Sequence, residues 1–190
     1  MQIETLIQNI KTLPQPENRP LVVAISGFGG AGKTTLANTL NAQLESSHTV
    51  SIDSFSNHEW HRNADWDNFD RDRFIKEILQ PAHDNNFPLT YRHEPWPGQV
   101  AKEPMKVPPA DCLIVEGCSI FHPELLKYYD YKIWMDCTLS EATKRAMWRD
   151  RHVHKNEQDY YWKNIWMPND KDFFEKYRPD NAANITLKSY

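Results

Sequence analysis

Residues 27–35 read Gly27-Phe28-Gly29-Gly30-Ala31-Gly32-Lys33-Thr34-Thr35, and this stretch decides the fold. It follows the apolar run 21–25, which is typical of a strand buried on both faces. Leu36, Leu40 and Leu44 come next, at the four-residue spacing of one helix face. A strand, a G-x-x-x-x-G-K-T loop and a helix in this order predict a phosphate-binding loop, rather than a glycine-rich turn that happens to precede a helix.

The residue types of this loop suit a nucleoside triphosphate. Its glycines let the backbone curl so that N–H groups point at phosphate oxygens, and the following helix adds the positive end of its dipole. Lys33 can reach the β- and γ-phosphates, and the Thr34 hydroxyl can ligate Mg²⁺. The stretch from Gly27 to Thr35 is therefore the predicted nucleoside-triphosphate site.

Length and composition predict a single domain over residues 1–190, with an N-terminal helix and Pro-rich linker at 1–20. The net charge of −4 argues against a nucleic-acid partner, and no apolar segment approaches the ~18 residues of a membrane span. Cys112, Cys118 and Cys137 form no C-x-x-C pair, so we interpret them as reduced, structural thiols of a cytoplasmic protein.

Two further strands end in an acid. Asp53 follows the run 49–52, and Glu116 closes the strongly apolar run 112–115. In a largely parallel sheet the carboxyl ends of the strands line one crevice, so both acids should lie beside the phosphate loop. Asp53 could take a proton from a substrate hydroxyl or hold Mg²⁺, and Glu116 could complete the magnesium shell. A third such strand is expected over 131–136, and a last one over 182–187.

The middle of the chain is rich in aromatic residues and prolines. Between Phe55 and Asp72, rings alternate with polar groups and favour either a substrate wall or an anchored loop. A helix is expected over 73–83, ended early by Pro81, and an extended excursion over 84–110. Four residues of this excursion are candidates for substrate contact or for plain packing: Tyr91, Arg92, His93 and Trp96.

A cluster of basic residues follows the third strand. Arg145 and Arg149 share one helix face, and Arg151 comes next, within a segment 145–156 that we interpret as a lid over the transferring phosphoryl group. The alternative is a solvated basic face. The aromatic stretch 157–177 is expected to be a packing surface, divided into two helices by Pro168.

Four segments together resemble the uridine kinase family, which is related to phosphoribulokinase and bacterial pantothenate kinase. They are ISGFGGAGKTTLA, SIDSFS, LIVEGCSIF and DCTLSEATKRAMWRDR, with YRPDNAANITL as a weaker closing match. The resemblance implies an α/β P-loop fold with helices on both faces, ATP and Mg²⁺ as cofactors, and Asp53 as general base. This sequence departs from the family pattern at Ser56, at Asn184 and in its short lid.

The resemblance also implies roles for individual residues. Asp70, with Asp67 as the rival, would bind ribose hydroxyls, and Tyr91 would lie near the base. The predicted catalytic residues are Lys33, Asp53, Arg149 and Arg151; the predicted substrate contacts are Asp53, Asp70, Tyr91, His93 and Arg145; the predicted metal ligands are Thr34, Asp53 and Glu116.

The expected activity is a phosphotransferase with an alcohol acceptor. A nucleoside such as uridine or cytidine is the leading acceptor, and nicotinamide riboside, pantothenate or a sugar is the alternative. A nucleotide-gated hydrolase or regulator remains open as a different class. The expected partner is the small-molecule acceptor, with homo-oligomerisation possible.

Overall fold

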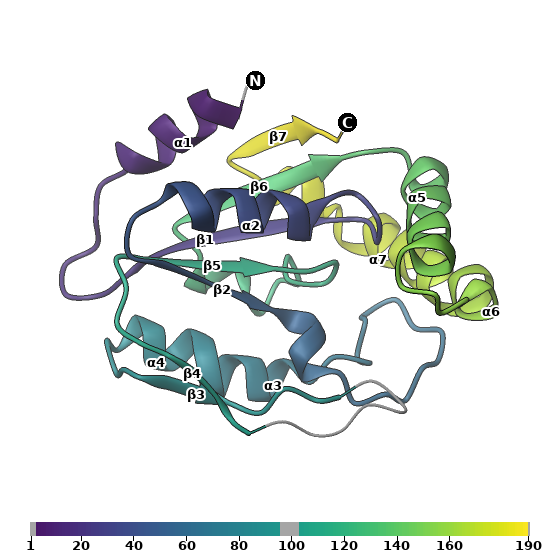
Figure 1. Ribbon diagram of the computed structural model, residues 1–190, viewed down its shortest axis with the longest axis horizontal. Helices are drawn as coiled ribbons and strands as arrows, with labels where there is room; N and C mark the ends of the chain where they lie inside the picture. The colour runs from purple at the N-terminus through teal and green to yellow at the C-terminus, as the bar shows by residue number, and fades with distance from the viewer. Residues whose placement is uncertain (1–2, 96–102, 190) are drawn as a thin grey trace.

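The computed structural model describes residues 3–95 and 103–189, so the candidate Trp96 lies outside the described residues. Figure 1 shows one central sheet with helices on both faces and a small hairpin beside it. The helices are α1 Ile3–Lys11, α2 Lys33–Gln43, α3 Arg71–Phe74, α4 Gln80–His83, α5 Leu139–His152, α6 Asp159–Tyr161 and α7 Met167–Tyr177. The strands are β1 Leu21–Gly27, β2 Ser47–Ser51, β3 Leu89–Tyr91, β4 Met105–Val107, β5 Cys112–Glu116, β6 Tyr131–Asp136 and β7 Ile185–Lys188.

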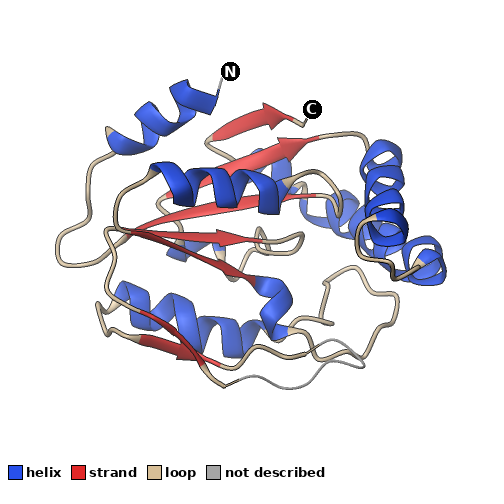
Figure 2. Ribbon diagram, in the orientation of Figure 1, coloured by secondary structure: helices blue, strands red, loops and turns tan. Residues whose placement is uncertain are grey.

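The five-stranded sheet has the order β2-β5-β1-β6-β7, and all its pairs are parallel. Strand β1 lies in the middle and is buried along its whole length, which explains why it is apolar at successive positions. Because β1 and β5 pair in register from Leu21↔Cys112 to Ile25↔Glu116, the phosphate loop and Glu116 emerge at the same edge. The predicted α/β P-loop architecture is therefore confirmed, and Figure 2 shows the strands enclosed by helices.

Each face of the sheet has its own core. Helices α1 and α2 cover one face, where Ile25, Leu40 and Ile133 belong to one buried cluster. The helical segment 71–83 and helix α7 contribute to the cluster on the other face, which includes Phe74, Val115 and Phe173. No helix in the described part of the chain is long and apolar enough to cross a membrane.

Two predicted helix breaks are wrong. Pro81 lies inside a continuous helical segment over 71–83, and Pro168 lies inside another over 159–177. In each case a π-helical turn, Ile75–Leu79 or Trp162–Trp166, ends two residues before the proline. The wider i→i+5 hydrogen bonding relieves the clash between a proline ring and the preceding turn, so the helix continues.

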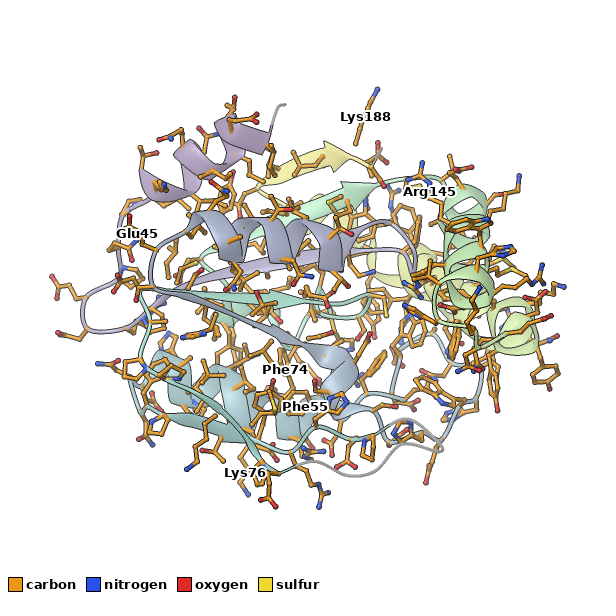
Figure 3. The ribbon with its side chains drawn as sticks, viewed as in Figure 1. Glu45, Phe55, Phe74, Lys76, Arg145 and Lys188 are labelled. Carbon is orange, nitrogen blue, oxygen red and sulfur yellow. The ribbon has the colours of Figure 1, made fainter. Side chains whose placement is uncertain are left out.

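The β3–β4 hairpin carries a correction for Tyr91. Leu89 and Tyr91 point inward while Thr90 is exposed, and the Tyr91 ring stacks on Phe55 at 5.4 Å between centroids. Phe55, labelled in Figure 3, also meets Phe74 edge-on at 5.1 Å. Tyr91 is thus a core residue. The last strand is also shorter than expected, because residues 179–182 form a 3₁₀ turn before β7.

Candidate functional site

The phosphate loop joins β1 to α2. Gly30 and Gly32 both have a φ of 90°, which lies in the left-handed region that glycine adopts at little cost. A Cβ at Gly30 would lie 2.1 Å from the Ala142 carbonyl oxygen of α5, so a side chain has no room there. Lys33 is buried, and its Nζ donates to the Phe28 carbonyl oxygen at 2.9 Å. The loop is therefore packed directly against the helix that carries the predicted lid arginines.

Two carboxylates flank this loop, as the strand ends predicted. Glu116 is buried at the end of β5 and accepts from the Thr34 hydroxyl at 3.3 Å. Asp53 lies in the 3₁₀ turn after β2, deep in the site but with its side chain open to solvent. Burial and the charge of Asp53 raise the pKa of Glu116, opposed by Lys33. Partial desolvation in the site raises the pKa of Asp53, and the nearby charges of Lys33, Arg149 and His93 oppose that shift.

The residues at this edge fit a magnesium ion. Thr34, Asp53 and Glu116 offer only oxygen donors, which are the ligands that Mg²⁺ prefers. The two carboxylates repel one another, so a cation between them would relieve the repulsion. The described residues contain no group of three or more His, Cys, Asp and Glu side chains placed to hold a metal. The protein would thus supply few ligands and leave the others to phosphate and water, as is usual for Mg²⁺.

A cavity of about 820 Å³ opens at this end of the sheet, within the usual size of a small-molecule site. Its lining includes much of the predicted site: Gly29, Gly30, Gly32, Lys33, Thr34, Thr35, Asp53, Glu116, Arg145 and Arg149. Of the other loop residues, Ala31 is fully buried, and Phe28 turns its ring toward Trp134 and Phe174 in a separate cavity of about 600 Å³. Lys33 and both acids line the larger cavity, so the chemistry belongs there.

The cavity also has an aromatic wall, which we define as Trp60, Trp66, Phe69, Trp162 and Trp166; all five line it. Trp60 meets Trp166 edge-on at 5.5 Å between centroids, and Trp162 meets Trp166 edge-on at 4.9 Å. The predicted substrate wall of the 55–72 loop is thus at the cavity. Two of the five wall residues, Trp162 and Trp166, come from the 157–177 stretch, which was expected only to pack.

Buried amides hold the two parts of this wall together. Asn169 is fully buried, donates to Asn68 Oδ1 at 3.2 Å and accepts from the backbone N–H of Asn63 at 2.8 Å. Asn68 in turn donates to the Glu59 carbonyl oxygen at 2.6 Å. These contacts tie the loop 57–70 to α7, so the position of the loop's part of the wall depends on that helix.

The structure separates the predicted lid arginines. Arg145 and Arg149 lie on α5 and line the cavity, and Arg145 is labelled in Figure 3. Arg149 is held by the buried carboxylate of Asp150 at 2.7 Å. Arg151 instead pairs with Asp159 at 2.8 Å and with Glu157, and it does not line the cavity. The segment 145–156 is therefore the last half of a helix followed by a short loop.

Three predicted substrate contacts lie away from the cavity lining. Asp70 caps α3 by accepting from the Arg73 backbone N–H at 2.9 Å. Tyr91 is the core residue described above. His93 is half-buried beside Asp53, and its Nδ1 lies 3.0 Å from the Ser54 hydroxyl. The structure brings these residues to the layer behind the site.

Asp170 is the site residue that the sequence did not reveal. It is buried on α7, lines the cavity, and accepts from the Gly29 backbone N–H at 2.6 Å. Burial raises its pKa to about 6, against the opposing effects of Lys33 and of Gly29. No local pattern marks this residue, because only the packing of α7 on the phosphate loop brings it there.

The sequence is similar to known proteins. A family model described as Zeta toxin matches residues 3–74. A uridine kinase of Brevibacillus brevis is 25% identical over 148 residues, which cover 69% of this chain and 66% of that protein, slightly under two thirds of its length.

Solved structures agree in fold. A possible uridine kinase from Bacillus stearothermophilus superposes with a TM-score of 0.71 at 18% identity, over 97% of this chain and 96% of that one. A putative fructose transport system kinase from Silicibacter sp. TM1040 superposes with a TM-score of 0.78 at 20% identity, over 98% and 99% of the two chains. The chain therefore has the P-loop kinase fold, and its sequence is similar to uridine kinases.

Proposed function

We propose that this protein transfers the γ-phosphoryl group of ATP to a hydroxyl group of a small molecule. One observation carries the proposal: Lys33 and Asp53 line the same cavity as the aromatic wall. The phosphate loop supplies an anion site, Asp53 a base, and the wall a place for the acceptor. A hydrolase needs the loop but no such wall.

In this mechanism the protein mainly positions the phosphates and neutralises their negative charge. The phosphate-loop N–H groups and Lys33 hold the β- and γ-phosphates, while Arg149 and Arg145 approach from α5 and balance the charge that spreads over the transferred group. Asp53 accepts the proton of the attacking hydroxyl. Mg²⁺, held by Thr34, Asp53 and Glu116, would add positive charge at the phosphates.

A nucleoside is our leading acceptor, with uridine or cytidine first. Indole and phenyl rings of the aromatic wall offer flat apolar surfaces on which a pyrimidine can stack. The similarity to uridine kinases supports the same acceptor.

A second acceptor class, small alcohols without a pyrimidine, is favoured by the positions of Asp70 and Tyr91. These two residues were expected to contact ribose and base, yet one caps a helix and the other is in the core. A neighbour in fold is described as a fructose transport system kinase, so a sugar belongs among the candidates.

The test is ADP release from ATP and Mg²⁺ with single acceptors: uridine, cytidine, adenosine, nicotinamide riboside, pantothenate, ribose and fructose. We expect one of them to raise the rate strongly, and Lys33→Ala to abolish the increase. A slow rate that ignores every acceptor would contradict the kinase proposal and favour a nucleotide-gated hydrolase.

A further inference from the structure

Asp170 stands in an unusual place for a carboxylate. Its Oδ2 accepts from the backbone N–H of Gly29 at 2.6 Å, inside the loop expected to bind phosphate. The Trp162 ring packs so closely on Gly29 that a Cβ there would lie 2.7 Å from it, and the same Cβ would lie 3.3 Å from Asp170 Oδ2. An acid and an indole from one helical segment therefore close over this part of the loop.

Two phosphate-binding groups of the loop have partners within the protein in this state. Backbone N–H groups of such loops are an anion site. Here one of them already has an anionic partner, Asp170, and the Lys33 ammonium group donates to the Phe28 carbonyl oxygen at 2.9 Å. An incoming triphosphate must displace both contacts. The buried negative charge of Asp170 also repels the negative charge of the triphosphate.

We propose that the Asp170 carboxylate occupies the phosphate loop at Gly29 until a nucleotide displaces it. The inference rests on the proposed function, since it takes ATP as the ligand of the loop. Asp170 thereby weakens nucleotide binding, in contrast to Lys33, which strengthens it.

The same helical segment connects this contact to the acceptor side. Trp162 and Trp166 of the aromatic wall precede Asp170 by less than three turns, and the neighbouring residue Asn169 holds the loop 57–70 through Asn68. Release of Asp170 from Gly29 therefore acts on a segment that carries two of the five wall residues. Filling of the phosphate loop is in this way coupled to the shape of the acceptor pocket.

The experiment compares ADP and ATP affinity by calorimetry for the full chain and three variants. Asp170→Asn keeps the shape and a carbonyl oxygen for Gly29 but removes the charge, and Asp170→Ala removes the contact. Glu175→Gln is the matched control, because Glu175 is an exposed acid of α7 that faces the smaller cavity. A thermal melt establishes that each variant is folded.

We expect both Asp170 variants to bind ADP and ATP more tightly than the wild type, on the order of tenfold, because a like charge has been removed from the anion site. Glu175→Gln should bind as the wild type does. If Asp170 had only a structural role, the variants would bind ADP and ATP more weakly than the wild type, because the phosphate loop would be disturbed. Equal or weaker affinity in folded Asp170 variants overturns the inference while the proposed function stands.

A second measurement tests the coupling. The wall holds four of the seven tryptophans, so ADP should change the tryptophan fluorescence of the wild type. This change should be smaller in Asp170→Ala, and an unchanged response would overturn the coupling. Absence of ADP and ATP binding in the wild type and in both variants would overturn the inference together with the proposed function.

Discussion

The indole N–H of Trp162 donates to the carboxylate of Asp150 at 2.7 Å. The other oxygen of this buried carboxylate accepts from the Arg149 guanidinium at 2.7 and 2.9 Å. One member of the aromatic wall thus fixes the acid that holds a lid arginine. The aromatic wall and the cavity-lining Arg149 are therefore connected through Asp150.

Trp162→Phe should reveal this connection. The phenyl ring keeps most of the packing, but Asp150 loses a donor, which costs about 1–3 kcal/mol for a buried charged acceptor. We also expect a lower kcat, because Arg149 is less well fixed. Denaturant unfolding and steady-state kinetics measure the two effects, with Trp148→Phe as control, since Trp148 is 61% exposed. A kcat equal to that of the control would contradict the connection.

Arg149 and Arg151 should behave differently although both were predicted to be catalytic. Arg149 lines the cavity, so Arg149→Ala should lower kcat on the order of 10²-fold, as loss of a charge-stabilising group does. Arg151 pairs with Asp159 and Glu157, and Arg151→Ala should leave kcat nearly unchanged. Equal losses in both variants would mean that α5 turns Arg151 inward during turnover.

Neighbouring residues and strand order made the phosphate side of the site predictable. The loop is a local strand–glycine–helix pattern, and Asp53 and Glu116 follow from the rule that parallel strands end at one edge. For Tyr91 the sequence left substrate contact and packing open, and the structure shows packing: Tyr91 and Leu89 point to the buried side of the hairpin. In a short hairpin two large apolar residues on one face belong to the core.

The acceptor side was only half predictable. Trp60, Trp66 and Phe69 belong to the aromatic loop that the sequence predicts, but Trp162, Trp166 and Asp170 belong to a distant helical segment. Asp170 lies 141 residues beyond Gly29. Their place depends on how α7 packs and on a π-helical turn that keeps the helix continuous through Pro168. The spacing of residues along the sequence predicts neither the packing of α7 nor the π-helical turn.

Asp53→Asn tests the base. Asparagine keeps the size of the side chain but cannot accept the proton, so kcat should fall by about 10²–10⁴-fold. ADP affinity should persist, since Lys33 and the loop N–H groups remain. Single-turnover phosphoryl transfer and calorimetry separate these effects. Near-normal transfer would remove Asp53 as the base and leave it as a metal ligand alone.

Asn169→Ala tests the link between α7 and the loop 57–70. The substitution leaves Asn68 and the Asn63 N–H without their buried partner, so we expect about 1–3 kcal/mol less stability. The acceptor KM should rise more than the ATP KM, because the loop carries Trp60, Trp66 and Phe69. Asn164→Ala is a suitable control, since Asn164 is exposed on the same helical segment. A parallel rise of both KM values would argue against a local effect on the wall.

The ligand-free protein should become more stable, relative to Asp170→Asn, as the pH falls from 7 toward 4. Asp170 has a pKa of about 6 in the folded state against an ordinary value of 3.8. Above pH 6 the Asp170 carboxyl is ionised in both the folded and the unfolded protein, so it adds no pH dependence to the free energy of unfolding. Between these values the folded state binds a proton that the unfolded state releases, so the free energy of unfolding rises by about 1.4 kcal/mol per pH unit. This gain in stability levels off below the pKa of the unfolded state, on the order of 3 kcal/mol in total.

Urea unfolding of the wild type and Asp170→Asn at several pH values measures the difference in their stabilities, in which the titration of the other acids cancels. Curves that stay parallel from pH 7 to 4 would show that Asp170 is already ionised at low pH, held by Gly29 and Lys33 more strongly than burial opposes it.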